Sequence, residues 1–139
     1  MGGEPGTHCL RRKAKYGRST LTEDVAVRGL ERLRRAMEER RVFLRPDLTL
    51  AELADEIGVP RSHLSQLVNE RCGKSFPELL AEHRVAEARR LLADRSLDHL
   101  TVESIGQRAG FNSRSAFFDA FKKATGQTPA GHRKHRSAE

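Results

Sequence analysis

The sequence has no tryptophan, one tyrosine and two cysteines among its 139 residues. Two cysteines are too few for a disulfide framework, and neither Cys9 nor Cys72 lies in a CxxC or His-rich spacing of the kind that binds zinc. We therefore expect reduced thiols and no metal or other cofactor. No apolar run approaches the ~20 residues that span a bilayer, and residues 1 to 20 lack the apolar middle of a secretion signal, so a cytoplasmic protein is expected.

Sequence signatures of catalysis are missing as well. There is no P-loop, GxSxG or HExxH motif and no paired arrangement of catalytic carboxylates, so we expect the chain not to be an enzyme. The histidines near the end, His132 and His135, flank Lys134 and fit a basic end better than a metal site. Six phenylalanines and one tyrosine form no evident stacking platform, which disfavours binding to RNA.

Basic residues are in excess. The chain has 26 Lys and Arg against 19 Asp and Glu, a net charge of +7, which favours a polyanionic partner. Residues 1 to 20 supply +4 of this charge and are rich in glycine, so we expect a basic disordered tail or linker there. One alternative is that this tail binds a membrane surface or an acidic protein. Binding would then survive deletion of residues 110 to 136 and be lost without residues 11 to 18.

Helix signals fill the rest of the chain, and no segment alternates like a strand. Thr20 and Glu23 have capping-box spacing, which predicts an amphipathic helix to about residue 41 and a connection to residue 45. Similar boxes at Thr49–Glu52 and Ser75–Glu78, together with glycine and proline positions, predict the remaining helices. These are expected at residues 49–58, 60–73, 76–93, 101–109, 112–125 and 129–135. The fold class is therefore all-α, with about seven helices.

The chain also resembles itself. Thr49, Leu53 and Gly58 align with Thr101, Ile105 and Gly110 at an offset of 52 residues. The partners of Leu64, Val68 and Gly73 are Phe117, Phe121 and Gly126, at an offset of 53. Each copy is a capped short helix, a glycine-containing turn and a second helix with one apolar stripe, which is the pattern of a helix-turn-helix. We thus predict two helix-turn-helix units, 49–73 and 101–126, joined by the long helix 76–93.

The alternative explanation of the repeat is a stack of generic helical hairpins, as in solenoids. Such arrays usually need three or more units, whereas only two are found here, separated by a long unmatched helix. In a helix-turn-helix the second helix enters the major groove of DNA while the first crosses the backbone. Charge agrees with this, because residues 60–74 carry Arg61, Arg71 and Lys74 against Glu70, and residues 110–136 are more strongly basic.

These segments resemble the DNA-binding domain of the AraC/XylS-type transcription regulators. The resemblance covers about residues 46 to 136, in "LTLAELADEIGVPRSHLSQLVNERCGKSFPELLAEHRVAEARRLL" and "LTVESIGQRAGFNSRSAFFDAFKKATGQTPAGHRKH". Its signature lies around Gly110-Phe111, Phe117, Phe121-Lys122, Gly126 and Pro129. The helix at 22–41, with the preceding "KYGRSTL", is further similar to members whose DNA-binding domain follows a membrane-embedded sensor.

The resemblance implies a sequence-specific regulator of transcription, commonly an activator, that inserts recognition helices at about 61–71 and 113–124 into successive major grooves of double-stranded DNA. RNA polymerase is an implied partner, and a sensor domain would lie on the N-terminal side, since no small-molecule site is expected in this chain. The implied base contacts are Ser62, Ser65, Gln66, Arg114, Ser115, Phe118 and Asp119. The implied contacts to the DNA backbone are Thr49, Arg61, His63, Asn69, Lys74, Thr101, Ser113, Lys122, Lys123 and Arg133.

The chemistry of these positions can be weighed separately. Arg114 suits a bidentate contact to guanine and Gln66 one to adenine, although each also fits an exposed, solvated helix face. Asp119 lies where many relatives have arginine, and it would either accept from a cytosine amino group or repel phosphate. Gly106 replaces the usual alanine, which costs about 1 kcal/mol in helix propensity. Gly131 and His132 replace a bulky pair, which predicts a frayed last helix.

Overall fold

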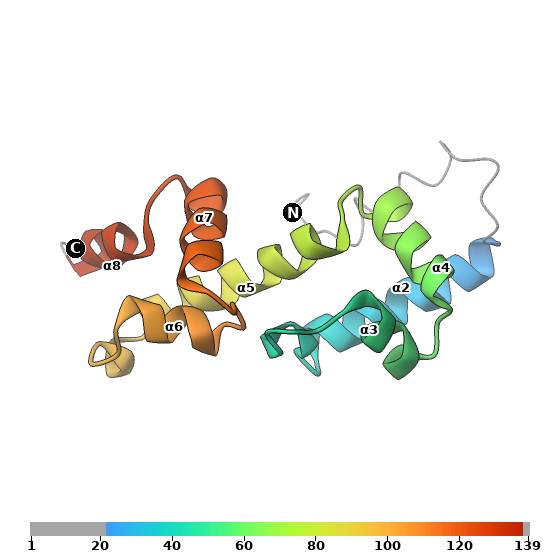
Figure 1. The fold of residues 1–139 in the computed structure, drawn as a ribbon, viewed down its shortest axis with the longest axis horizontal. Coiled ribbons are helices and arrows are strands. Elements are labelled where there is room, and N and C mark those ends of the chain that lie inside the picture. Colours follow the sequence, from blue (N-terminus) through green and yellow to red (C-terminus); the bar gives the residue numbers. More distant parts are fainter. Residues whose placement is uncertain (1–21, 138–139) are drawn as a thin grey trace. The chain divides into compact units, whose positions relative to one another are not determined.

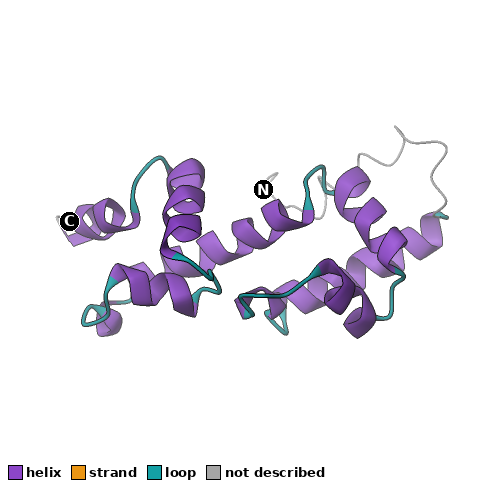
Figure 2. Cartoon of the chain, viewed as in Figure 1, coloured by secondary structure: helices purple, strands orange, loops and turns teal. Residues whose placement is uncertain are grey.

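The computed structural model describes residues 22–137, and in this part every regular element is helical (Figures 1 and 2). Seven α-helices follow one another along the described chain, as predicted. The expectations of a disordered basic tail in residues 1 to 20 and of a reduced thiol at Cys9 lie outside the described residues. The described helices fall into two compact units.

Unit 1 contains residues 22–42 and 48–79. Its helices are α2 (Glu23–Glu38), α3 (Leu50–Ile57) and α4 (Arg61–Gln66), and α4 continues into a π-helical turn, η3 (Leu67–Arg71). The first residues of α5 (Phe76–Ala93) also belong to this unit. Helix α3 packs on α4 and on α2, and α2 also packs on η3. The amphipathic helix predicted before the first helix-turn-helix is therefore part of the same packed unit.

The cap of helix α2 lies two residues later than predicted. Thr22 is the residue before the helix, and its hydroxyl accepts from the backbone N–H of Val25 at 3.3 Å. The capping box at Thr20 and Glu23 was thus wrong, because Glu23 is the first helical residue and not the third. The other two boxes are confirmed: Thr49 with Glu52 opens α3, and Ser75 with Glu78 opens α5.

The core of unit 1 is made by the apolar stripes that the sequence predicts. Leu33 and Met37 of α2 lie buried with Leu53 and Ile57 of α3. Leu67 packs on Ala26, and Gly29 lets α2 approach closely, since a Cβ on Gly29 would lie 2.6 Å from the Leu67 side chain. Cys72 is also among the buried residues of this unit.

Unit 2 contains residues 43–47 and 80–137. After the rest of α5 it has a short 3-10 turn, η4 (Arg95–Leu97), and then α6 (Val102–Arg108), α7 (Arg114–Thr125) and α8 (Pro129–Ser137). Phe117 and Phe121 of α7 are fully buried with Ile105 of α6 and Leu92 of α5. Helix α8 runs through Gly131 to Ser137, and fraying at this position stays a prediction. Its start is held by Thr128, whose hydroxyl accepts from the Gly131 N–H at 3.0 Å.

A short segment before α3, residues 43–47, packs within unit 2. Arg84 of α5 donates to the carbonyls of Phe43 and Arg45 at 2.7 and 2.8 Å. Gly110 has a positive φ of 106°, and a Cβ at this position would collide with the Phe43 carbonyl oxygen. Gly58, its partner in the sequence repeat, also has a positive φ, 71°. The predicted left-handed glycine in the turn of each unit is therefore confirmed.

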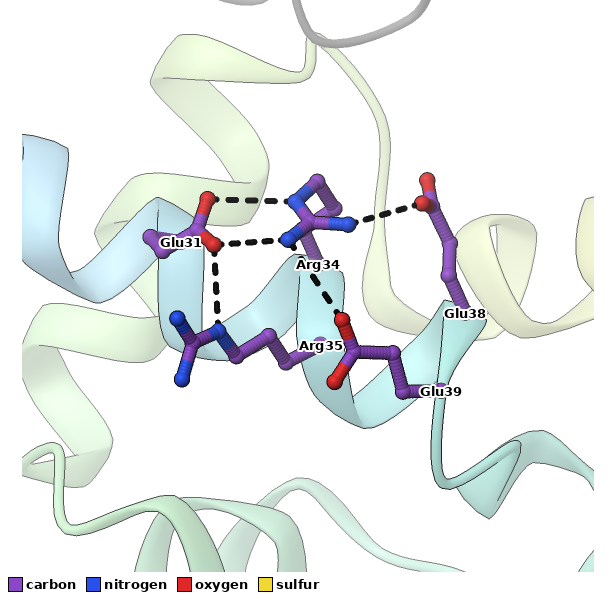
Figure 3. Close-up of polar contacts among 5 residues, drawn as sticks. All are labelled: Glu31, Arg34, Arg35, Glu38 and Glu39. Carbon is purple, nitrogen blue, oxygen red and sulfur yellow. Dashed lines mark hydrogen bonds and ion pairs between the residues drawn. The ribbon is translucent and has the colours of Figure 1, made fainter.

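The outer face of α2 carries a network of ion pairs (Figure 3). Glu31 accepts from Arg34 at 2.6 Å and from Arg35 at 3.1 Å, while Arg34 also reaches Glu38 at 3.0 Å. The hydrogen bond from Arg34 lowers the pKa of Glu31 from 4.5 to about 2. All these side chains are largely exposed, so the network supports the helix only modestly. Within residues 22–137, no helix is both long and apolar enough to cross a membrane.

Candidate DNA interface

The first predicted recognition helix is the α4–η3 segment. Leu64, Leu67 and Val68 are buried, which turns the opposite face of the helix outward. Ser62, Ser65, Gln66 and Asn69 follow helical spacing on that face, Ser62 and Asn69 being exposed and the other two half-buried. The structure thus brings the predicted base contacts of this unit together on one side. The Gln66 amide donates to the carboxylate of Glu70 at 3.2 Å.

The end of this helix widens into a π-turn that the sequence did not predict. The Cys72 N–H bonds to the carbonyl of Leu67 at 3.3 Å, five residues earlier. Within the widened turn, the side-chain amide of Asn69 donates to the backbone carbonyl of Ser65 at 2.9 Å. Single π-turns inside helices are frequent at functional sites. Here the turn changes the direction in which residues after Gln66 project.

Arg71 does not belong to the exposed basic face, which corrects the charge count for residues 60–74. Its side chain is only 7% exposed, and it pairs with Glu23 of α2 at 3.1 Å. One of its terminal nitrogens is buried without a partner. Of the basic residues predicted here, Arg61 is exposed and Lys74 half-buried. The positive charge that this face offers to a polyanion is therefore smaller than the sequence indicates.

The second predicted recognition helix, α7, has a clear division of faces. Phe117 and Phe121 point into the core of unit 2. Arg114, Ser115, Phe118, Asp119 and Lys122 follow helical spacing along another face, where all but the half-buried Phe118 are exposed. Lys123 is exposed beside them. Apart from Asp119, the charges on this outward surface are positive.

Arg114 makes two contacts within unit 2. Its Nε donates to a carboxylate oxygen of Glu103 in α6 at 3.0 Å, and its guanidinium carbon lies 4.4 Å from the centre of the Phe118 ring. The hydrogen bond from Arg114 is the main reason why the pKa of Glu103 lies below its ordinary value. Phe118 in turn packs edge-on against Phe117. Glu103 was missed at the level of sequence, because it lies eleven residues away on another helix.

Three predicted backbone contacts are helix caps. Thr49 and Thr101 precede α3 and α6, and Ser113 precedes α7; each hydroxyl accepts from a backbone N–H of the first turn. Helix starts present N–H groups and a positive dipole end to anions. At Thr49, however, the carboxylate of Glu52 already accepts from the backbone N–H at 3.1 Å.

The remaining predicted backbone contacts differ in their surroundings. Arg133 of α8 donates to the carbonyls of Leu100 and Leu97 at 2.6 and 3.3 Å, so its guanidinium anchors α8 to the loop before α6. His63 is half-buried, and its Nδ1 is buried without a partner. Lys122 and Lys123 are the exposed cations of the set in unit 2.

Comparison with known proteins agrees with this architecture. A family profile described as a helix-turn-helix domain matches residues 53–135. A Staphylococcus aureus (strain MSSA476) protein named an HTH-type transcriptional regulator is 35% identical over 92 residues, which are 66% of this chain and 12% of that protein. A Streptomyces lividans protein named an AraC-like transcription regulator is 36% identical over 87 residues, 63% of this chain and 28% of that protein.

Among solved structures, the C-terminal domain of AraT, a response regulator from Geobacillus stearothermophilus, is similar with a TM-score of 0.62 and 30% identity. The alignment covers 84% of this chain and 88% of that one. The chain spans only 12% of the length of the S. aureus regulators that it matches. The chain belongs to the AraC/XylS-type family of helix-turn-helix transcription regulators and comprises its double-stranded-DNA-binding domain.

Proposed function

We propose that this chain binds specific sequences of duplex DNA by inserting α4–η3 and α7 into successive major grooves. The observation that carries the proposal is the outward face of α7, where Arg114, Ser115 and Lys122 lie opposite the buried Phe117 and Phe121. A major groove admits one α-helix, and cations beside that helix interact favourably with the phosphates that border the groove. The α4–η3 segment likewise has a buried face and an outward face, and its outward face carries neutral polar side chains.

Within this proposal the two helices contribute different chemistry. Arg114 offers paired donors to guanine and Gln66 a donor and an acceptor to adenine, each worth about 1–3 kcal/mol of discrimination. The hydroxyls of Ser62, Ser65 and Ser115 can form hydrogen bonds with several different bases. The carboxylate of Asp119 suits a hydrogen bond from the cytosine amino group. Phe118 supports Arg114 with its ring face. Lys122, Lys123 and Arg61 neutralise phosphates, and the caps at Thr101 and Ser113 add helix-start N–H groups.

The test compares three polyanions with the full chain. Fluorescence anisotropy is measured for a mixed-sequence DNA duplex, an RNA hairpin and vesicles of anionic lipid, each at several salt concentrations. We expect tight, salt-dependent binding to the duplex and weaker binding to the other two. A Lys122→Ala, Lys123→Ala double variant should weaken duplex binding. A different result would instead support a tail that binds membranes. In that case the chain binds vesicles as tightly as the duplex, and this binding is unchanged in the double variant and lost on removal of residues 11–18.

We also infer that the parent protein is a transcription activator. It would contact RNA polymerase in the cytoplasm, and its sensor would be a separate domain. Activation is the commoner role in the family that the sequence resembles, and the similar Geobacillus domain is the C-terminal part of a response regulator. A membrane-embedded sensor, to which the helix at 22–41 bears similarity, would hold the domain on the cytoplasmic side. Transcription with purified polymerase from a promoter bearing a selected site tests this: activation should need the site, and repression would contradict the inference.

A further inference from the structure

Arg114 is held at the start of α7 by two groups of unit 2. It is the first residue of the helix, with its side chain 66% exposed. Glu103, in the first turn of α6 and 45% exposed, accepts from its Nε at 3.0 Å. The ring of Phe118, one helical turn further along α7, lies below the guanidinium at 4.4 Å. The contacts act on different parts of the group, one on an edge and one on a face.

Together these contacts define how the guanidinium is presented. An arginine has five N–H donors in a planar fork, one on Nε and two on each terminal nitrogen. Glu103 takes the Nε donor, and Phe118 fixes the plane through cation–π contact. The edge formed by the two terminal nitrogens is not used by these two contacts, so it remains for a further acceptor. Paired acceptors on one edge, as in guanine O6 and N7, match that edge.

We propose that Glu103 is a positioning residue that gives Arg114 its preference for guanine. The inference rests on the proposed function, in which Arg114 contacts a base. Without Glu103, the long side chain of Arg114 would be free to reach a phosphate in place of the base, and a phosphate contact carries no sequence information. The carboxylate also lowers affinity for DNA of any sequence, because its charge repels phosphates. Glu103 therefore lowers the affinity for DNA of any sequence while it increases discrimination between bases.

The experiment measures binding of the full chain to four duplexes and to one unrelated duplex. The four duplexes carry a site that the full chain selects from a random library, and they differ only at the base pair whose selection depends on Arg114. The variants are Glu103→Ala, Glu103→Gln, Arg114→Ala and the double variant Glu103→Ala, Arg114→Ala. Asp55→Asn, which removes an exposed carboxylate from α3, is the control for charge alone. Circular dichroism and thermal unfolding confirm that every variant is folded.

We expect Glu103→Ala to reduce the preference for guanine by about tenfold, which is within the 1–3 kcal/mol of a bidentate contact. Its binding to the unrelated duplex should become tighter. Glu103→Gln, which keeps a carbonyl acceptor for Nε, should retain part of the preference. In the Arg114→Ala background the Glu103 substitution should leave base preference unchanged, because Glu103 acts through Arg114. Asp55→Asn should alter affinity without altering preference.

Three results would overturn the inference. In the first, Glu103→Ala keeps the full preference for guanine. In the second, it tightens binding to the guanine duplex more than to the others, which makes Glu103 a competitor for Arg114. In the third, its effect persists without Arg114. If Arg114→Ala itself leaves base preference intact, the proposed base contact has failed as well, and this single variant distinguishes the two failures.

Discussion

Gly106 in α6 lies so close to Phe117 in α7 that a Cβ at residue 106 would overlap the aromatic ring. Phe117 is among the largest fully buried side chains of the chain's described part, and it contacts Phe111, Phe118 and Phe121. At the level of sequence this glycine is only a departure from the usual alanine that weakens a helix. The structure gives it a packing role, because it allows α6 and α7 to approach.

A Gly106→Ala substitution should therefore destabilise the protein. Overpacking of a filled core costs about 1–3 kcal/mol, against a gain of about 1 kcal/mol in helix propensity. We expect a net loss of up to ~2 kcal/mol in urea unfolding. Gln107→Ala, at the next and exposed position of α6, is the control and should change stability by less than ~0.5 kcal/mol. An alanine variant as stable as the parent would contradict this packing.

The ion pair between the buried Arg71 and the exposed Glu23 predicts a stability effect in unit 1. Removing Glu23 leaves a buried guanidinium without its charged acceptor, so Glu23→Ala should cost about 1–3 kcal/mol. Asp24→Ala removes the neighbouring acidic residue, which is exposed, and serves as the matched control. Thermal unfolding measures both. Equal effects of the two substitutions would show that the pair contributes only helix-start charge.

The salt dependence of DNA binding should separate exposed from buried cations. Lys123→Ala should weaken binding to all duplexes alike and reduce the slope of log affinity against log salt by about 1. Arg71→Met also removes one positive charge, but that charge is buried against α2, so the slope should be unchanged. Affinities are measured by anisotropy between low and moderate salt. A lower slope for Arg71→Met would place that residue on DNA.

Base preference should respond to Gln66 and Arg114, and not to Lys123. Gln66→Ala and Arg114→Ala should each relax the preference at one base-pair position, by about 1–3 kcal/mol. The affected position should differ between the two variants, because the side chains lie on different recognition helices. Sites selected by each variant are compared with those of the parent chain. A uniform loss of affinity, with preferences intact, would make these residues backbone contacts.

The ion pairs on α2 predict a weak dependence of stability on pH. Because the pKa of Glu31 is lowered to about 2 from 4.5, its contribution is fully present above pH 4.5 and is lost as the pH falls toward 2. Glu31→Gln should lower the unfolding temperature slightly at neutral pH. The difference from the parent should shrink on acidification through this range. A difference that is constant from pH 7 to pH 2 would exclude the pairing.

Much of the fold is local information and could be predicted. Thr49 with Glu52 and Ser75 with Glu78 cap their helices within three residues, and Gly58 and Gly110 mark the two turns. Such signals act over one helical turn, so the sequence displays them directly. The repeat added the equivalence of the two units. Thr20 and Glu23 have the spacing of a capping box, but the cap of α2 is Thr22, which has Val25 at that spacing.

The missed features depend on contacts between distant residues. Arg71 appears basic and exposed in the sequence, yet its side chain is buried and pairs with Glu23, which lies 48 residues earlier. Glu103 and Arg114 meet only because α6 packs on α7, and Arg133 meets the Leu100 carbonyl only because α8 returns to the loop before α6. The π-turn at 67–71 has no simple sequence signature. These contacts decide which charges face outward, so they bear directly on the site.

Selection of preferred sites from a random duplex library, with the full chain as bait, tests the central claim most directly. We expect enrichment of sites with two groups of specified base pairs, centred about 10 base pairs apart in one orientation. One group should contain a guanine whose selection is lost with Arg114→Ala. No enrichment, or a single group of specified base pairs, would contradict sequence-specific binding through two recognition helices.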